Sequence, residues 1–473
     1  MNRFLMTFRM LVTLFAIAIG VGLFGSSSAH STRPNVLLIA IDDLNDWVGC
    51  LNGHPDTRTP NIDRLAARGT LFTNAHCQAP ICNPSRTSVM YGVRPSTSGI
   101  YMNGPLPWNV DHMNQLTTMP RWFAKHGYDT ATTGKIYHGS RLPKDDFDLV
   151  GPRPGQRLKD LDVRIVNTFP QDKPGLWDFG PQDYDEGLFQ DHVDASWAIE
   201  QLSQDAQKPF FLTVGFYRPH VPFYSPRRIY EMLSRDQVTL PDVKQDDWSD
   251  IPAIAADVTA NRAPPPHSWF VEENQWKPAV QAYLACIRWT DQQVGRLLDA
   301  LDGSPHADNT IVVLYSDHGF HLGEKSRWTK FSLWERSTHV PLIIVAPEKP
   351  AGQRCSRPTE LLSIYPTLVE LCELPVNDRV EGRSVVPLLS DASADWPYLA
   401  VTTHGKDNHA VRSDRYRYIR YHDGSEELYD MVSDPQEWNN LVAGKLSDQH
   451  SGVIADLSKA LPTTNRAPAR AGR

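Results

Sequence analysis

The sequence predicts an α/β protein in which helices sandwich a large mixed, mostly parallel sheet, followed by a smaller C-terminal α+β subdomain with an antiparallel sheet. Residues 35–41 (NVLLIAI) form a continuous apolar run, which is typical of a central strand buried on both faces. Similar runs alternate with helical segments up to Gly382, and short alternating segments follow. We therefore expect a large domain over residues 33–390 and a subdomain over residues 391–460.

The N-terminus predicts a secretory signal peptide over residues 1–29. Arg3 and Arg9 precede an apolar run over residues 10–24, and small residues continue to Ala29. The run is short for a membrane span, although an uncleaved anchor remains the alternative. We expect a periplasmic or secreted protein with no stable membrane association after the signal is removed.

The elements of the large domain follow from caps and apolar periods. Thr59-Pro60 begins a helix that Gly69 ends, and a second helix ends at Gly127. Further strands are expected at residues 128–133, 210–215 and 310–315, and further helices at residues 283–301 and 363–374. The subdomain should contain strands at residues 398–403, 410–413, 416–421 and from 427, with a disordered tail over residues 461–473.

Charge and cysteine content narrow the class of protein. The net charge of -8 over 473 residues gives no support for nucleic-acid binding, which favours a basic face. Six cysteines are too few for a disulfide scaffold, and we expect one bridge, between Cys355 and Cys372.

Polar residues follow four of the expected strands. They are Asp42-Asp43, Lys135 with His138, His220, and Asp317-His318. Because ligands bind at the carboxyl ends of strands in open α/β sheets, these residues predict one shared crevice. Adjacent buried carboxylates repel each other, so a divalent cation is expected among them. Oxygen ligands suit Ca²⁺ or Mg²⁺, whereas the imidazole of His318 suits Zn²⁺ or Mn²⁺ better.

Residues 82–92 (CNPSRTSVMYG) predict a helix that begins near Cys82 and ends at Gly92. Cys82 would then lie at the positive end of the helix, where an anion is favoured. A reduced core thiol or one end of a disulfide are the alternatives for this cysteine.

This segment resembles the C-x-P-S-R signature of the sulfatase family, in the alkaline-phosphatase superfamily. RPNVLLIAIDD, TTGKIYH, RPHVPF, YSDHGFHLGE and Trp328-Thr329-Lys330 resemble further family blocks in their usual order. Asp317-His318, GKIYH and RPHVPF are most similar to the iduronate-2-sulfatase-like branch. The chain departs from the extended signature at Tyr91, where the family usually has threonine.

The resemblance implies an alkaline-phosphatase-like fold, and it implies that a maturation enzyme oxidises Cys82 to formylglycine. It also implies one Ca²⁺, held by Asp42, Asp43, Cys82, Asp317 and His318. Arg86, Lys135, His138, His220 and Lys330 match the family's remaining polar positions.

These positions suit the cleavage of a sulfate ester. Arg86 would hold the hydrated aldehyde, while Lys135 and Lys330 would bind sulfate oxygens. His220 would protonate the leaving oxygen, and His138 would act as the base that releases sulfate.

The expected substrate is a sulfated saccharide, with Trp108 stacking on a sugar and Arg218 binding a uronate carboxylate. A phosphate or phosphonate ester hydrolase of the same superfamily and a non-catalytic carbohydrate-binding relative are the alternative functions. His54, His76, His112, His126 and His321 are interpreted as structural, with His321 a reserve candidate for the site.

Overall fold

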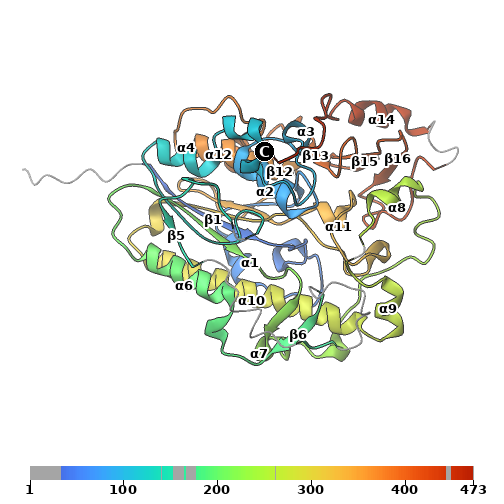
Figure 1. Ribbon diagram of the computed structural model, residues 1–473, viewed down its shortest axis with the longest axis horizontal. Coiled ribbons are helices and arrows are strands. Elements are labelled where there is room, and N and C mark those ends of the chain that lie inside the picture. Colours follow the sequence, from blue (N-terminus) through green and yellow to red (C-terminus); the bar gives the residue numbers. More distant parts are fainter. Residues whose placement is uncertain are drawn as a thin grey trace, which may run out of the picture.

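Figure 1 shows the computed structural model of the protein, which describes residues 33–139, 141–152, 164–166, 177–261, 263–443 and 449–471. The expected signal peptide, residues 1–29, lies outside the described residues. Among the helices that are described, none is both long enough and apolar enough to cross a membrane.

An eight-stranded sheet forms the centre of the large domain, in the order β11-β2-β10-β9-β1-β7-β4-β5. Its strands are β1 (Asn35–Ile41), β2 (Thr70–Phe72), β4 (Asp129–Gly134), β5 (Leu149–Val150), β7 (Phe210–Phe216), β9 (Thr310–Ser316), β10 (Leu342–Val345) and β11 (Gln353–Cys355). Neighbouring strands pair in parallel, except that β10 runs antiparallel to β9 and β2. The mixed, mostly parallel sheet confirms the predicted fold class.

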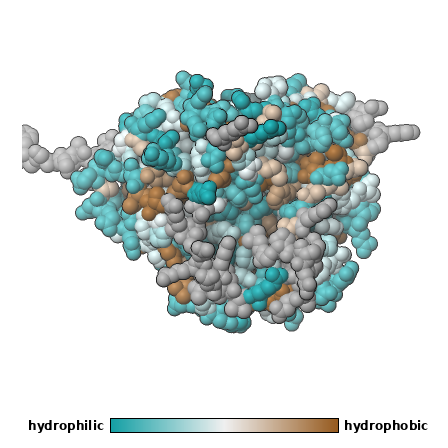
Figure 2. Space-filling view, in the orientation of Figure 1, coloured by the Kyte–Doolittle hydropathy of each residue, from teal (hydrophilic) through white to brown (hydrophobic). Residues whose placement is uncertain are grey.

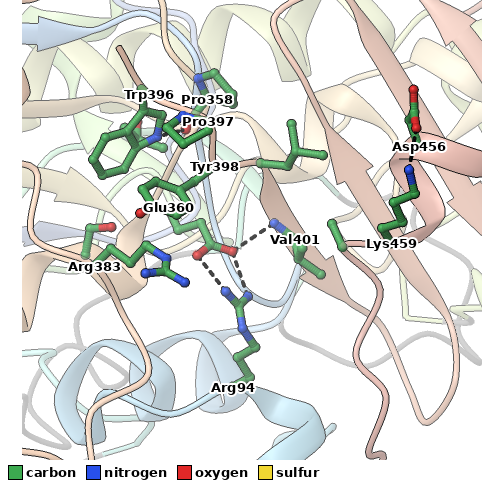
Figure 3. Close-up of a pocket in the computed structure, with 14 residues that line it drawn as sticks. Arg94, Pro358, Glu360, Arg383, Trp396, Pro397, Tyr398, Val401, Asp456 and Lys459 are labelled. Carbon is green, nitrogen blue, oxygen red and sulfur yellow. Dashed lines mark hydrogen bonds and ion pairs between the residues drawn. The ribbon is translucent and has the colours of Figure 1, made fainter. Parts of the chain in front are cut away.

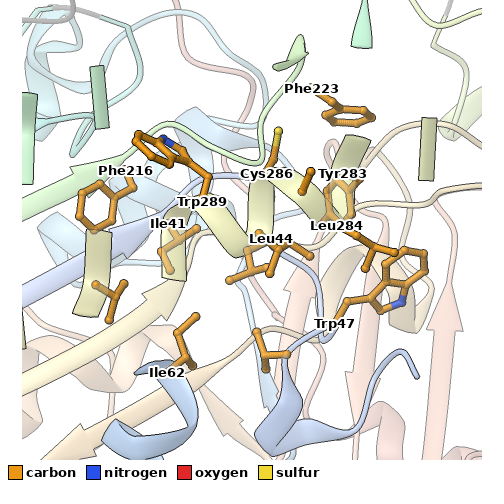
Figure 4. Packing of buried hydrophobic residues seen from close by; sticks show 14 of the residues in the cluster. Ile41, Leu44, Trp47, Ile62, Phe216, Phe223, Tyr283, Leu284, Cys286 and Trp289 are labelled. Carbon is orange, nitrogen blue, oxygen red and sulfur yellow. The ribbon is translucent and has the colours of Figure 1, made fainter. Parts of the chain in front are cut away.

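The central strand β1 is buried on both faces, as its continuous apolar run predicts. Leu37, Ile39 and Ile41 belong to a hydrophobic cluster with α1 (Pro60–Ala66), α6 (Gln190–Leu202) and α10 (Trp276–Asp302). Val36, Leu38 and Ala40 belong to a second cluster with α2 (Cys82–Tyr91), α4 (Met119–Lys125) and α12 (Ile364–Leu371). Figure 4 shows Ile41 and Leu44 packed between Ile62 of α1 and the long helix α10.

The remaining helices and strands are short. The helices are α3 (Pro95–Ser98), α7 (Arg227–Tyr230), α8 (Ile254–Val258), α9 (His267–Glu272), α11 (Glu335–Thr338), α13 (Val386–Ser390) and α14 (Ser451–Ser458). The 3-10 turns are η1 (Gly49–Leu51), η2 (Pro107–Asn109), η3 (Asp111–Gln115), η4 (Glu186–Leu188), η5 (Arg235–Gln237), η6 (Ala307–Asn309), η7 (Glu324–Ser326) and η8 (Leu361–Ser363). Two strand pairs lie outside the main sheet: β3 (Ala75–His76) with β12 (Thr359–Glu360), and β6 (Phe179–Gln182) with β8 (Phe223–Pro226).

The C-terminal part forms the predicted antiparallel sheet, of strands β13 (Ala400–Thr403), β14 (His409–Arg412), β15 (Tyr416–Arg420) and β16 (Glu426–Asp430). In Figure 1 this sheet and α14 lie at one end of the molecule, beside α11. Val411, Tyr418 and Leu428 form a small cluster with Leu457 of α14 and Leu461.

Composition predicted disorder from Leu461, whereas the structure shows this segment in contact with the large domain. The Arg466 amide donates to Ser96 O at 2.8 Å, and the Ala469 amide donates to Gly99 O at 2.8 Å. Tyr101 donates its hydroxyl to Arg466 O at 2.8 Å. Backbone groups need no apolar side chains to form these bonds, so composition alone could not indicate them.

Ion pairs with buried members join the large domain to the C-terminal sheet. Arg417 of β15 is fully buried and pairs with Glu335 of α11 and with Glu437, the latter at 3.0 Å. Trp334 Nε1 donates to Glu427 Oε2 of β16 at 2.8 Å. The large domain and the C-terminal sheet are therefore joined by buried polar contacts.

The face of the molecule in Figure 2 is mainly hydrophilic, with hydrophobic residues in separate patches. This is expected when the large apolar side chains fill an interior core.

Candidate active site

Four parallel strands end at the same edge of the main sheet and bring the predicted residues together. Ile41, the last residue of β1, is in register with Phe216 of β7 and Ser316 of β9. Gly134 at the end of β4 is in register with Gly215 of β7. The next residues along each strand, Asp42-Asp43, Lys135, the 217–220 turn and Asp317-His318, therefore meet at one edge, as predicted.

Helix α2 brings Cys82 and Arg86 to this edge. Ile81 is the extended N-cap residue, Cys82 is the first helical residue, and Gly92 ends the helix at a φ of 72°. Because residues four apart lie on one side of a helix, Arg86 follows Cys82 on the same face. Its Nε donates to Asp317 Oδ2 at 2.7 Å, and a terminal nitrogen donates to Asp42 Oδ1 at 3.2 Å.

The three carboxylates Asp42, Asp43 and Asp317 are fully buried. Lys135 pairs with Asp42, and Lys330 Nζ donates to Asp43 Oδ1 at 2.6 Å. Burial raises the pKa of Asp317 to about 6, although Arg86 and His318 oppose that rise. Each carboxylate has a cationic partner, because burying several unpaired negative charges would cost more than folding could supply.

The Cys82 sulfur lies at the centre of the cationic groups. His318 Nε2 is 3.2 Å from Sγ and Lys135 Nζ is 3.8 Å from it, and His138 also forms a hydrogen bond to this side chain. Burial would raise the pKa of the thiol, but Lys135, Lys330 and His318 lower it well below its ordinary value. The cationic groups therefore favour the thiolate form of Cys82.

The donor set fits a divalent cation. Ligand atoms of Asp42, Cys82, Asp317 and His318 all lie within 4.8 Å of one another, and those of Asp42, Asp43, Cys82 and His220 form a second such group. Asp43 Oδ2 is buried and has no hydrogen-bond partner. A buried carboxylate oxygen without a donor is a position that a cation would fill.

His220 faces the cluster through one ring nitrogen. Its Nδ1 is 2.6 Å from Val221 O, so the proton on Nδ1 is donated to that carbonyl. Nε2 lies 4.0 Å from Asp43 Oδ2 and faces the site. His220 is therefore oriented to exchange a proton at Nε2.

Arg218 and Trp108, which we expected to contact a sugar, have other partners in the structure. Arg218 is 7% exposed, its Nε donates to Tyr224 O at 2.8 Å, and a terminal nitrogen donates to His220 O at 3.3 Å. The Trp108 ring packs edge-on against Tyr137, with 5.5 Å between ring centroids. These contacts favour a role for Arg218 in holding the turn that carries His220.

Two residues of the site escaped the sequence reasoning. The Tyr217 ring centroid is 5.0 Å from Lys135 Nζ and 4.8 Å from the His220 ring. Asn83 Nδ2 donates to Met102 O at 3.0 Å and to Pro105 O at 2.9 Å, which fixes that loop beside the start of α2. Tyr217 directly follows β7, so its place at a strand end was an available signal.

The histidines that we interpreted as structural have structural partners. His321, the reserve candidate, forms a hydrogen bond of 2.8 Å between its Nε2 and Ser332 Oγ. His54, His76, His112 and His126 lie within bonding distance of Thr239 O, Asn74 Oδ1, Ser98 O and Trp122 O.

The expected bridge between Cys355 and Cys372 is not formed. All six cysteines lie in the described part of the chain, and each is free there. Cys372 instead forms a hydrogen bond with Tyr128, and burial raises its pKa to about 12.

Comparisons with known proteins identify the family. The sulfatase family profile matches residues 34–374, and the profile named N-sulphoglucosamine sulphohydrolase, C-terminal, matches residues 323–467. A sulfatase of Formosa agariphila is 39% identical over 457 residues, which cover 92% of this chain and 87% of that protein. Iduronate 2-sulfatase of Mus musculus is 32% identical over 79% of this chain and 74% of its own length.

A solved structure, the phosphonate monoester hydrolase of Agrobacterium radiobacter, has the same fold. Its TM-score is 0.74 at 22% identity, with 93% of this chain and 100% of that chain covered. At this identity the likeness shows the fold alone.

Proposed function

Because the chain belongs to the sulfatase family, we propose that it is an exported enzyme that hydrolyses a sulfate ester of a saccharide. The single observation that carries this proposal is Cys82 at the start of α2, with its sulfur 3.2 Å from His318 Nε2 and 3.8 Å from Lys135 Nζ. A cationic pocket around a nucleophile suits an anionic sulfuryl group, whose charge repels attack until it is neutralised. The proposed export follows from the N-terminal segment, residues 1–29.

Two groups would complete the site. Oxidation of Cys82 by a maturation enzyme would supply a hydrated aldehyde as nucleophile, and a divalent cation, which we take to be Ca²⁺, would act as Lewis acid on sulfate oxygens. Asp42, Asp43, Asp317 and His318, with residue 82, would hold that cation.

The chain's own residues then divide the work. Lys135 and Lys330 are both close enough to the Cys82 sulfur to lower the pKa of its thiol. They would bind sulfate oxygens as point charges. His220 would give the proton on Nε2, which faces the site, to the leaving alkoxide, because Nδ1 is committed to Val221 O. His138, bonded to the residue 82 side chain, would take a proton there and so release the sulfate.

The proposed substrate is a 2-sulfated uronic acid residue. The support is the similarity of this chain to iduronate 2-sulfatase over most of its length, together with Asp317-His318 at the end of β9. Two donors of Arg218 bind backbone carbonyls, so this proposal does not rest on a contact between Arg218 and the substrate carboxylate.

A phosphonate or phosphate ester hydrolase is the second candidate, since a protein of that activity shares the fold. The fold does not select the ester. Charge separates phosphate monoesters, which carry one more negative charge than sulfate monoesters, but a phosphonate monoester carries the same single charge as a sulfate monoester, so an assay on matched esters distinguishes these two. A non-catalytic carbohydrate-binding relative would not need the catalytic set around Cys82.

The test is an assay of purified protein, coexpressed with a formylglycine-generating enzyme, on matched sulfate and phosphonate esters and on sulfated disaccharides. We expect hydrolysis of sulfate esters, formylglycine at residue 82 by peptide mass spectrometry, and no activity in Cys82→Ala. Faster cleavage of phosphonates than of every sulfate ester would overturn the proposal. Full activity with only a thiol at residue 82 would overturn the nucleophile.

Arg218 provides a separate test of specificity. Since its guanidinium holds His220 O, Arg218→Ala should lower kcat/KM by roughly tenfold on 2-sulfated uronates and neutral sulfated sugars alike. A loss confined to uronates would restore Arg218 as the contact for the substrate carboxylate.

A further inference from the structure

A cavity of about 380 Å³ lies where the large domain, the segment after α13 and the C-terminal subdomain meet (Figure 3). Its wall includes Arg94, Glu360, Arg383, Trp396, Tyr398 and Lys459. None of the residues that line the cavity belongs to the catalytic cluster around Cys82.

One wall of the cavity is aromatic and held in place. Trp396 Nε1 donates to Pro358 O at 3.0 Å, which fixes the indole. The Tyr398 ring packs edge-on against it, with 4.9 Å between centroids and 79° between planes. Tyr398 is 38% exposed, so ring surface remains open to a ligand. Flat rings with a fixed orientation suit the apolar C–H face of a sugar ring, whose hydroxyls then point to the rim.

Most charges of the cavity are already neutralised by partners in the protein. Glu360 accepts from both terminal nitrogens of Arg94, at 2.6 and 2.7 Å, and from the Val401 amide at 2.9 Å. Lys459 pairs with Asp456 at 2.7 Å.

Arg383 is the exception. Its guanidinium carbon lies 4.0 Å from the Tyr398 ring centroid, and no hydrogen bond or ion pair of its side chain occurs within the described residues. A guanidinium stacked on a ring keeps its N–H edge free for a planar or tetrahedral anion. Figure 3 shows this side chain pointing into the cavity beside Glu360 and Arg94.

We propose that this cavity is a second saccharide site, which binds one anionic sugar residue at a distance from the catalytic cluster. The sugar ring would stack on Trp396 and Tyr398, and its sulfate or carboxylate would bind the Arg383 guanidinium. The site goes beyond the proposed function, because it binds without cleaving and would hold a polymeric substrate on the enzyme.

The test uses isothermal titration calorimetry on the full chain with Cys82→Ala, which prevents turnover. The probes are a sulfated uronate-containing hexasaccharide, its desulfated form, which retains the carboxylates, and a neutral hexasaccharide. We expect two binding events for the sulfated probe, one of which weakens about tenfold in Arg383→Gln, the value of a lost charge-assisted contact. Arg379→Gln, which removes the same charge from the same exposed segment, should bind like the parent.

Tyr398→Ala should weaken the same event, and it is a safer variant than Trp396→Ala because Tyr398 is partly exposed. Equal affinity of the parent for the neutral probe, or unchanged binding in both Arg383→Gln and Tyr398→Ala, would overturn the proposal. Equal affinity for the desulfated probe would support it with the carboxylate as the anion. If the enzyme cleaves no sulfate ester but Arg383→Gln still loses an event, the proposed function fails and this site stands.

Discussion

Tyr217 links Lys135 and His220, two of the side chains that the proposed chemistry needs. Its ring lies beside Lys135 Nζ on one side and the His220 ring on the other, at 5.0 and 4.8 Å. A buried cation–π contact contributes about 2 kcal/mol, enough to select one position for a flexible lysine side chain. We infer that Tyr217 is a positioning residue.

Tyr217→Leu should therefore lower kcat/KM on a sulfate ester by roughly tenfold, because Lys135 loses the ring that orients it. Tyr217→Phe keeps the ring and should retain most of the activity. Steady-state kinetics on both variants measure this difference. If the Phe variant were as impaired as the Leu variant, the hydroxyl and not the ring would be responsible.

For single residues, the sequence predicted which charged side chains lie in the site better than it predicted the groups that they bind. Asp42, Lys135, His220 and Asp317 could be located because each follows an apolar strand, and strand ends meet at one edge. Arg218 looked like a ligand-binding residue because it lies two positions before His220, but backbone carbonyls that no pattern reveals bind its guanidinium. Lys330 reaches Asp43 across 287 positions of sequence, and only the family resemblance identified it.

At the scale of elements, helix α6 buries a carboxyl group against the sheet. Asp194 Oδ1 accepts from Thr133 Oγ1 of β4 at 2.7 Å and from Gln190 at 3.0 Å, while Oδ2 is buried without a partner. Burial raises the pKa of Asp194 to about 8, and the neighbouring Asp191 adds to the rise. The protonated form of Asp194 is therefore the one that folding favours.

This predicts a pH-dependent stability that Asp194→Asn should remove. An acid with a raised folded-state pKa gives its full stabilisation below about pH 4, and this is lost as pH rises through about 8. Between these values the unfolding free energy of the parent should fall, relative to the Asn variant, by up to about 1.4 kcal/mol per pH unit. Urea unfolding at several pH values measures the slope. Parallel pH curves for the two proteins would contradict it.

Helices and strands could be predicted from the sequence where their apolar pattern extends over many residues. β1, β7 and β9 agree closely with their predicted ranges, because each is a continuous, mostly apolar run. Helix α10 was predicted over residues 283–301, and it begins seven residues earlier, at Trp276. The antiparallel strand β10 has four residues, and its direction depends on pairing with β9 and β2, which are distant in sequence. The tail after Leu461 is held by backbone bonds that its composition does not indicate.

For the whole molecule, the buried ion pair between Glu335 of α11 and Arg417 of β15 links the two parts of the chain. Arg417 is fully buried, and its pair with Glu335 of α11 connects the C-terminal sheet to the large domain, whereas its pair with Glu437 lies within the C-terminal part. Removing one partner of a buried pair leaves an uncompensated charge, at a cost of about 3 kcal/mol. We therefore expect the two parts to unfold in a single transition.

Glu335→Ala should lower the unfolding free energy by about 3 kcal/mol and separate the calorimetric transition into two. Asp183→Ala removes an exposed carboxylate that pairs with Arg227, and it should leave the melting temperature unchanged. Scanning calorimetry of the three proteins tests both points. A single unshifted transition in Glu335→Ala would show that the interface depends on apolar packing alone.

The contacts of Arg86 determine which inactive variant is suitable for crystallising the protein with an uncleaved ligand. Its donors bind Asp42, Asp317 and the carbonyls of Lys135 and Ile136, so the same side chain fastens α2 to the ends of three strands. Replacing Arg86 would leave four buried acceptors without their donor. An Arg86 variant without activity could therefore be misfolded, and its inactivity would not show a catalytic role for this residue. Cys82→Ala removes one small side chain and none of the hydrogen bonds that hold α2 to the strand ends. It is therefore the better variant for crystallising the protein with an uncleaved ligand.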